Sequence, residues 1–232
     1  MLNFQELSQP KVFGLDLSND IIRVAQLPDK FAFGANIKEA VTKANIKTKY
    51  VHACLPEQEC FIRVAPKDGN IKKEVESNIP LSLKEIYYDT QETRQGLLIV
   101  AAKRKIVDQT IDLLKKAGLI AKSLEPESIA LARALVKTPD SLLIIKFGKT
   151  KINFVICQNN IVYFSATQEK NHILQQLQDY IDFYQTKNGQ ITKIVLCGEK
   201  IPDQQFLEKL KIPIEIAQNP DYTTAIGLAL KQ

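Results

Sequence analysis

The sequence predicts a mixed α/β protein built from two lobes, and three observations lead to this prediction. Two stretches, Lys11–Leu27 and Leu142–Val155, each read as an apolar strand, a short polar turn and a returning strand. Each stretch opens one half of the chain, which indicates two related lobes. Between them, residues 46–122 alternate strand-like and helix-like segments in a compact α+β order, which indicates a unit inserted in the first lobe.

The composition is that of an ordinary globular protein. Of the 232 residues, 45% are hydrophobic and 25% are charged. The longest apolar run, Leu97–Ala102, is too short to span a membrane, and the N-terminal MLNFQELSQPK lacks the apolar segment of a secretory signal. We therefore expect a cytoplasmic protein with enough length to bury a core in each lobe.

Charge and metal-ligating residues exclude several functions. The net charge is +5, but the lysines stand beside acidic residues, as in Lys72-Lys73-Glu74, and form no basic stripe with interleaved aromatics. Nucleic acid is therefore not an expected partner. The four cysteines show no paired spacing, and His52, Cys54 and Cys60 lack a fourth ligand for zinc. We expect reduced, buried thiols and no metal site.

Local patterns place the elements of the first part of the chain. Pro28–Gly34 is interpreted as a loop. The elements expected after it are a helix around Ile37, Val41 and Ala44, strands Tyr50–Leu55 and Cys60–Ala65, a helix marked by Ile71, Val75 and Ile79, strands Ile86–Thr90 and Leu97–Ala102, helix Lys105–Ala117, and a helix from Pro126 through Val136. Pro80 ends one helix, and Gly118 suits the C-terminal cap of another.

A turn signal over Lys137–Asp140 marks the boundary to the second part. The elements expected after it are the hairpin Leu142–Val155, strand Ile161–Thr167, helix Asn171–Lys187, strand Ile191–Cys197, a helix near Asp203–Lys211, a short strand near Ile214–Ala217, and a closing helix from Asn219-Pro220 through Leu230. The long helix carries a wide apolar stripe. Gly227 costs its helix about 1 kcal/mol relative to alanine, so we expect a close packing contact there.

Many of these runs, in this order, resemble the PilM family of cytoplasmic actin-like proteins in type IV pilus assembly. Gly14–Asp20 aligns without a gap with the first phosphate turn of the family. Other similar runs are IKTKYVHACLP, FIRV, IPLSLKEIYYDTQ, LLIVAAKRKIVDQTIDLLKKAGL, EPESIALARAL, DFYQT, KIVLCG and YTTAIGLAL. The resemblance implies an actin-like, ribonuclease H-like fold of two reduced lobes with an inserted α+β subdomain of the FtsA type.

The resemblance also implies a division of the chain. The first lobe would comprise residues 1–45 and 123–138, the inserted subdomain residues 46–122, and the second lobe residues 139–232. The subdomain that normally covers one side of the nucleotide is missing, because Gln168–Lys170 stand in its place.

Nucleotide contacts are implied at three turns of the family. The corresponding candidates here are Asp16, Ser18, Asn19, Lys146, Gly148, Lys149, Thr150 and Gly198. Lys146 stands where the family has an aspartate that holds a metal-bound water, Ser18 replaces a glycine, and Gly198 stands alone where a glycine cluster is usual. Because hydrolysis needs metal ligands and a positioned water, we expect a pseudo-ATPase with a vestigial site and no catalytic residues.

We expect Lys146 to pair with Asp16 across a closed cleft, and neither ATP nor magnesium is an expected cofactor. One alternative is nucleotide binding without hydrolysis, in which Lys146, Lys149 and Lys151 attract phosphate. A second is a nucleotide-binding actin-like ATPase with weak activity. Another is a filament-forming protein of the FtsA kind.

A partner is implied as well. In the PilM family the N-terminal tail of PilN, an inner-membrane protein with one span, docks between the first subdomain and the inserted one. An extended tail binds through main-chain hydrogen bonds and side-chain pockets. Candidate contacts are Phe61, Arg63, Ile79 and Leu81, although burial statistics favour Phe61 and Ile79 as core residues. We therefore expect an adaptor at the inner face of the cytoplasmic membrane, attached through its partner; a homo-oligomer and a secretion role stay open.

Overall fold

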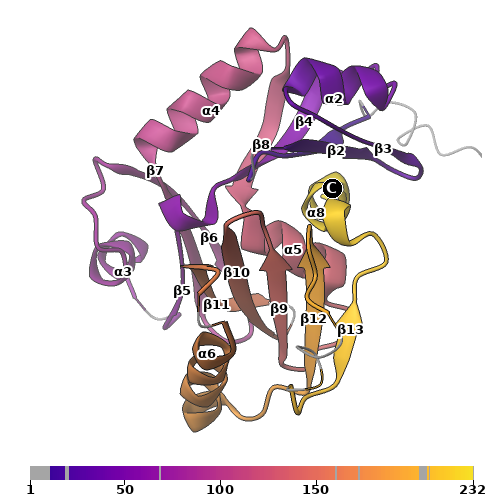
Figure 1. Ribbon diagram of the computed structural model, residues 1–232. Coiled ribbons are helices and arrows are strands. Elements are labelled where there is room, and N and C mark those ends of the chain that lie inside the picture. The colour runs from indigo at the N-terminus through magenta and orange to yellow at the C-terminus, as the bar shows by residue number, and fades with distance from the viewer. Residues whose placement is uncertain are drawn as a thin grey trace, which may run out of the picture.

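The computed structural model describes residues 11–18, 21–67, 69–159, 161–171, 173–203, 208 and 210–231. Its strands form three sheets (Figure 1). Two sheets have five strands, in the orders β3-β2-β1-β4-β8 and β11-β10-β9-β12-β13, and the third has three, in the order β5-β7-β6. The two large sheets belong to the two lobes that the sequence predicts.

The first sheet contains the first predicted hairpin. Its strands are β3 (Lys30–Gly34), β2 (Ile22–Gln26), β1 (Phe13–Asp16), β4 (Tyr50–Leu55) and β8 (Ile120–Pro126). β1 pairs antiparallel with β2 and parallel with β4, and β4 pairs parallel with β8. Phe13, Leu15 and Val51 form its core with helix α2 (Ile37–Lys43), which begins at the side-chain cap of Asn36.

Two predictions for this sheet are wrong. Pro28–Gly34 is not a loop throughout, because Lys30–Gly34 forms edge strand β3 and pairs with β2. The turn takes only residues 27–29, and Ala32 and Gly34 point inward in strand alternation. Strand β8 was not predicted at all. Its mixed polar sequence, IAKSLEP, carries little strand signal and becomes a strand through parallel pairing with β4.

Strand β4 joins the first sheet although it lies within the predicted inserted unit 46–122. Its hydrogen bonds run to β1 and β8. The third sheet therefore begins later, after the 3₁₀ turn η1 (Glu57–Glu59). It contains β5 (Cys60–Ala65), β7 (Leu97–Lys103) and β6 (Ile86–Glu92), with helices α3 (Ile71–Asn78) and α4 (Arg104–Lys116) beside it. Gly118, at φ +75°, follows α4 in the left-handed conformation expected of a cap.

The second lobe contains the second predicted hairpin. β9 (Leu142–Phe147), β10 (Lys151–Gln158) and β11 (Ile161–Glu169) form an antiparallel meander, while β12 (Lys193–Gly198) lies parallel between β9 and β13 (Ile214–Ile216). Leu143 and Ile145 face the long helix α6 (Ile173–Asn188). Leu142 and Ile144 face the opposite side, toward helix α5 (Glu127–Leu135). The predicted helix near Asp203–Lys211 lies mostly outside the described residues.

Helices α5 (Glu127–Leu135) and α8 (Thr223–Ala229) join the lobes (Figure 1). α8 follows the 3₁₀ turn η2 (Pro220–Tyr222) and packs on both α5 and β1. A Cβ at Gly227 would lie 1.9 Å from the Ala130 carbonyl oxygen, and one at Gly14 would lie 2.0 Å from the Ala225 carbonyl oxygen. The close contact predicted at Gly227 is therefore confirmed: two backbones meet there without room for a side chain.

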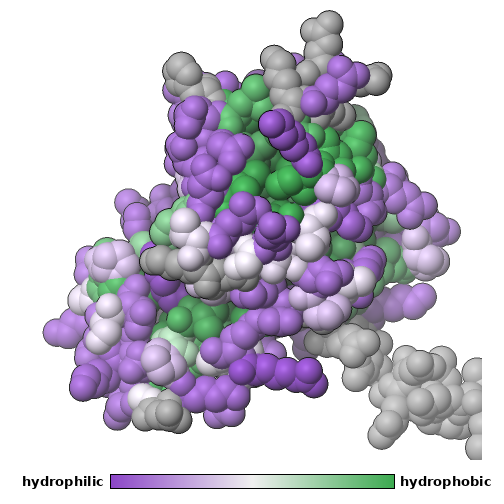
Figure 2. Space-filling view, turned by 90° about the horizontal axis from the view of Figure 1, so that it is seen from below, coloured by the Kyte–Doolittle hydropathy of each residue, from purple (hydrophilic) through white to green (hydrophobic). Residues whose placement is uncertain are grey.

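The underside of the molecule combines a mostly hydrophilic surface with one broad hydrophobic area (Figure 2). In the second lobe, an apolar cavity of about 360 Å³ opens between α6 and β12, with Leu177, Ile181 and Ile194 in its lining. Within the described residues, no helix is both long and apolar enough to cross a membrane.

Candidate functional site

Lys146 is the central residue of the candidate site because its charged side chain lies inside the protein. It belongs to β9, the middle strand of the second sheet, and shares the α5-facing side with Leu142 and Ile144. Asn153 and Cys197 are its direct neighbours on β10 and β12. Only 4% of its side chain is exposed. A buried lysine needs compensating partners, since burial strongly disfavours an unpaired charge.

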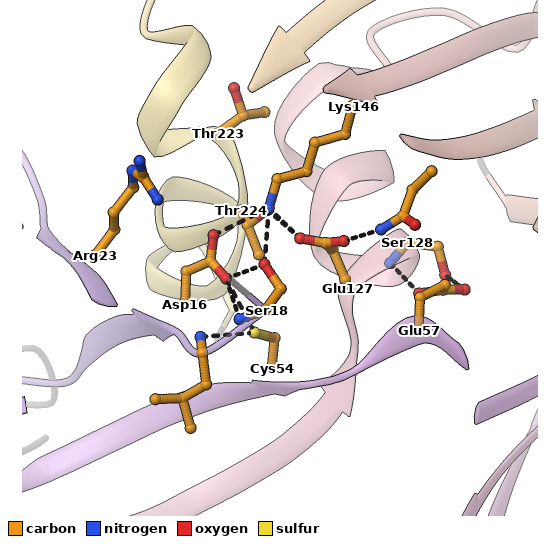
Figure 3. Close-up of polar contacts among 12 residues, drawn as sticks. Asp16, Ser18, Arg23, Cys54, Glu57, Glu127, Ser128, Lys146, Thr223 and Thr224 are labelled. Carbon is orange, nitrogen blue, oxygen red and sulfur yellow. Dashed lines mark hydrogen bonds and ion pairs between the residues drawn. The ribbon is translucent and has the colours of Figure 1, made fainter. Parts of the chain in front are cut away.

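Four side-chain oxygens surround the Lys146 Nζ (Figure 3). It donates to Asp16 Oδ2 at 3.1 Å, Ser18 Oγ at 2.9 Å and Thr224 Oγ1 at 3.0 Å, and it forms a close ion pair with Glu127 Oε1. Asp16 ends β1, Glu127 begins α5, and Thr224 lies in α8. The pairing of Lys146 with Asp16 that the sequence predicts is thus confirmed, and it forms part of a larger buried cluster.

Asp16 is held by donors on both oxygens. Its Oδ1 accepts the Ser18 backbone N–H at 2.8 Å, the Ser18 hydroxyl, and the Cys54 thiol at 3.3 Å. Burial works against its charge, but Lys146 and the Ser18 hydrogen bonds outweigh it and lower the pKa of Asp16 below its ordinary value. Burial likewise opposes the charge of Lys146, yet Asp16 and Glu127 raise the pKa of that ammonium. Both groups are therefore charged at neutral pH.

Glu127 connects this cluster to further buried polar groups. Its second oxygen accepts the Asn153 side-chain amide, whose own oxygen accepts the Thr167 hydroxyl at 2.7 Å. Nearby, Glu57 accepts the Ser128 backbone N–H at 2.9 Å and the Ser128 hydroxyl at 2.8 Å. Burial raises the pKa of Glu57, against the hydrogen bonds from Ser165 and Ser128. Burial also raises the pKa of the Cys54 thiol well above its ordinary value, so this thiol stays protonated.

The space beside the cluster is small. A cavity of about 50 Å³ lies against Lys146, Glu127, Ser18, Gly148 and Asn153. Sites for small organic ligands are usually about 300–1,000 Å³, whereas a water takes up about 30 Å³ of the liquid. The Lys146 ammonium therefore occupies the centre of the site, between Asp16 and Glu127, and only a small space remains beside it.

A second contact between the lobes lies beside the first. Arg23 of β2 forms an ion pair of 2.8 Å with Glu199, which directly follows β12, and their side chains are only 6% and 16% exposed. The rings of Phe31 in β3 and Tyr222 in η2 also meet edge to face, with centroids 5.7 Å apart. The cleft between the lobes is thus bridged by polar and aromatic contacts.

The predicted nucleotide-site residues do not all converge. Asp16 and Lys146 form the cluster, and Ser18 and Gly148 lie with Lys146 at the small cavity. Lys149 and Thr150 are exposed in the β9–β10 turn, and Asn19 lies outside the described residues. Gly198 has φ +95°, and a Cβ there would lie 2.2 Å from the Phe147 carbonyl oxygen, so close packing of β12 on β9 explains this glycine.

Sequence reasoning missed Glu127, Thr224 and Asn153. Glu127 lies within the EPESIALARAL run, at the first position of a helix that Pro126 announces, where acidic residues are common. Glu127 could have been predicted, because a buried lysine often needs a second carboxylate beside it. Thr224 and Asn153 carried no signal, because only the packing of α8 and the register of β10 bring them to Lys146.

A groove lies between the first lobe and the inserted unit. Its volume is about 160 Å³, and its lining comes from β4, β6, β7, α4 and β8, with Leu55, Tyr88, Val100, Val107 and Leu124 among the residues. β6 is an edge strand of its sheet, and Tyr87 and Tyr88 are 43% and 41% exposed. We call this surface the lobe–insert groove.

The four predicted partner contacts are not part of the lobe–insert groove. Ile79 is buried in the core of the inserted unit, where Phe61 and Leu81 pack against the same cluster, and Arg63 is exposed on β5. Among the described residues, the lining of the lobe–insert groove includes none of these four. Arg63 lies on β5, at the opposite edge of the sheet from β6.

Comparisons with known proteins were made at the levels of sequence and structure. No protein-family model matches the chain, and no curated protein matches it. The chain does resemble solved structures. That of the PilM-PilN type IV pilus biogenesis complex gives a TM-score of 0.79 at 14% identity, over 95% of this chain and 98% of that chain.

Two further structures show the same architecture. The cytoplasmic domain of EpsL, an inner-membrane component of the type II secretion system of Vibrio cholerae, gives a TM-score of 0.68 at 12% identity, over 95% of each chain. A Bacteroides thetaiotaomicron protein with an actin-like ATPase fold and unknown function gives 0.55 at 9% identity, over 100% of both chains. The chain therefore has the actin-like ATPase fold, as the resemblance in its sequence predicted.

Proposed function

We propose that this chain is a cytoplasmic adaptor of a type IV pilus or type II secretion machine that binds the extended N-terminal tail of an inner-membrane partner. The observation that carries the proposal is the likeness, over nearly the whole chain, to the PilM-PilN complex structure. The likeness to the cytoplasmic domain of EpsL supports the same kind of role in secretion. The adaptor is peripheral to the membrane through its partner.

The lobe–insert groove is our candidate for the docking surface. It is lined mainly by apolar side chains and lies beside edge strand β6, whose outer backbone groups can pair with an added strand. Tyr87 offers a large ring with a hydroxyl group, and such residues often dominate binding energy. Arg104 stacks over the Tyr87 ring at 4.1 Å, and the Tyr87 hydroxyl donates to Asp108 at 3.3 Å, so this ring is held in place.

Binding should be measured with a fluorescent peptide that carries the cytoplasmic tail of the single-span protein encoded beside this chain. Tyr87→Ala should weaken binding by about 2 kcal/mol, or roughly 30-fold in Kd, because it removes the ring on the α4 side of β6, where Val107 lines the groove. Leu113→Ala is a matched control, since Leu113 is 46% exposed on α4 and does not line the groove. The proposal would be contradicted if the tail peptide bound no better than a scrambled peptide, or if both variants lost the same binding affinity.

We also propose that nucleotide hydrolysis is lost. The support is the buried Lys146, with Asp16 and Glu127 both committed to it, and a residual cavity of about 50 Å³. Catalysis of phosphoryl transfer depends on metal ions and on a positioned nucleophile, and here an ammonium occupies the space between the carboxylates. Calorimetric titration with magnesium and ATP should give no saturable heat at millimolar nucleotide. Micromolar binding would contradict this part of the proposal.

A further inference from the structure

The four oxygens around Lys146 have the composition of a cation site. Two are carboxylate oxygens, from Asp16 and Glu127, and two are hydroxyl oxygens, from Ser18 and Thr224. Hard divalent cations such as Ca²⁺ and Mg²⁺ prefer oxygen ligands of this kind. Because an ammonium has only three N–H donors for these four acceptors, hydrogen-bond matching alone does not explain the arrangement.

The charge balance supports the same interpretation. Without Lys146, Asp16 and Glu127 would place two negative charges in a part of the protein that solvent barely reaches, since each is 1% exposed. One ammonium neutralises only half of this charge, whereas a divalent cation would neutralise all of it. The carboxylates are also held in position independently of Lys146, through the Ser18 backbone and Cys54 on one side and Asn153 on the other.

The surrounding groups come from different parts of the fold (Figure 3). Lys146 belongs to the second lobe, Asp16 and Ser18 to the first, and Glu127 and Thr224 to the helices between them. A charge at this point therefore ties all three parts together. Since the lysine is covalently part of the chain, it cannot dissociate, and its effective concentration does not depend on the solution.

We propose that Lys146 is a built-in cation, which fills a divalent-cation site of four oxygens and holds the two lobes closed without metal or nucleotide. The closed arrangement is then a permanent property of the fold rather than a response to a ligand. This goes beyond the adaptor role, because it concerns what holds the lobes together and not what the chain binds.

The test is to remove the ammonium and offer a soluble cation instead. Wild-type protein, Lys146→Ala and Lys151→Ala are unfolded in urea with EDTA, CaCl2 or MgCl2, and unfolding is followed by circular dichroism. Wild type and Lys151→Ala should not respond to the cation. Lys146→Ala should be less stable in EDTA, and a cation at 100 times its Kd should raise the folding equilibrium constant about 100-fold.

A second variant identifies the site. Lys146→Ala combined with Glu127→Gln keeps the space but loses one carboxylate, so the cation response should fall at least tenfold. If Lys146→Ala is already unfolded in EDTA, circular dichroism instead measures whether CaCl2 or MgCl2 causes it to fold. The proposal is overturned if neither cation stabilises or folds Lys146→Ala, if wild type responds equally, or if the double variant responds as strongly. None of these outcomes depends on tail-peptide binding by wild type, so the adaptor role is tested independently of this proposal.

Discussion

Replacing Lys146 by methionine should destabilise the protein and make its stability depend on pH between 5 and 8. Methionine keeps a long unbranched side chain but removes the charge from between two carboxylates. The Lys146–Asp16 distance of 3.1 Å corresponds to an attraction of about 5 kcal/mol at an effective dielectric constant of 20. Part of this is offset by desolvation, and breaking a buried pair from one side costs about 3–5 kcal/mol, which is the loss we expect at pH 7.5.

The sign of the pH dependence follows from the pKa shifts. The lowered pKa of Asp16 contributes stability above its unfolded pKa of about 3.9, and this stability is lost as pH falls further. The raised pKa of Lys146 contributes stability below its unfolded pKa of about 10.4, and this is lost as pH rises through the folded value. Between pH 5 and 8, the wild-type contribution of the pair is therefore constant.

In Lys146→Met the attraction of the ammonium is lost, so burial and the nearby Glu127 raise the pKa of Asp16 above its wild-type value, while the hydrogen bonds from Ser18 remain. Protonation of Asp16 then relieves the destabilisation by about 1.4 kcal/mol for each unit of pKa shift. The stability of the variant should increase as pH falls from 8 to 5, while that of wild type stays level.

Urea denaturation followed by circular dichroism at pH 5, 6, 7 and 8 measures this effect. Lys151→Met is the matched control from the same hairpin, because Lys151 is 45% exposed and lies 4.0 Å from Glu169. We expect it to cost less than about 1 kcal/mol at every pH. A loss below 1 kcal/mol for Lys146→Met, or a profile parallel to that of wild type, would refute the assignment of Lys146 as the neutralising charge.

Two further predictions concern the contacts between the lobes. Gly227→Ala should lower the free energy of unfolding by about 1–3 kcal/mol, because its Cβ would lie 1.9 Å from the Ala130 carbonyl oxygen, and this loss outweighs a helix-propensity gain of about 1 kcal/mol. A variant that is more stable in urea denaturation would show that the helices separate easily. Arg23→Ala and Glu199→Ala should show a coupling of about 0.5–3 kcal/mol in a double-mutant cycle, since their 2.8 Å ion pair is mostly buried. If the two losses of unfolding free energy simply add, the pair does not help to hold the lobes together.

Hairpins and helices were predictable where the pattern was local. The hairpins around Asp16 and Lys146 were recognised from apolar runs separated by polar turns, and the structure places both as predicted. Strands β3 and β8 were not, because short edge strands depend on a neighbour that supplies hydrogen bonds. For the same reason, the sequence did not indicate that β4 lies in the first sheet beside β1.

The site was only half predictable. Asp16 and Lys146 could be paired because Asp16 ends the first strand of one hairpin and Lys146 is the last residue but one in the first strand of the related hairpin, and such positions in two facing lobes meet at the cleft. Ile79, a predicted partner contact, lies in the core of the inserted unit, and this apolar residue looks the same in sequence whether it faces a groove or a core. The residues of the lobe–insert groove belong to five separate elements, and no local pattern connects them.

The sequence by itself predicted two lobes that begin with related hairpins and a close contact at Gly227, and its resemblance to a known family predicted the actin-like fold. The hairpins follow from local periodicity, and the close contact follows from the cost of glycine in a helix. Only the tertiary structure decided what Lys146 does, because Ser18, Glu127 and Thr224 lie 128, 19 and 78 residues away from it along the chain. Folding brings their oxygens to one ammonium, and this long-range convergence supplies the buried carboxylates with a cation.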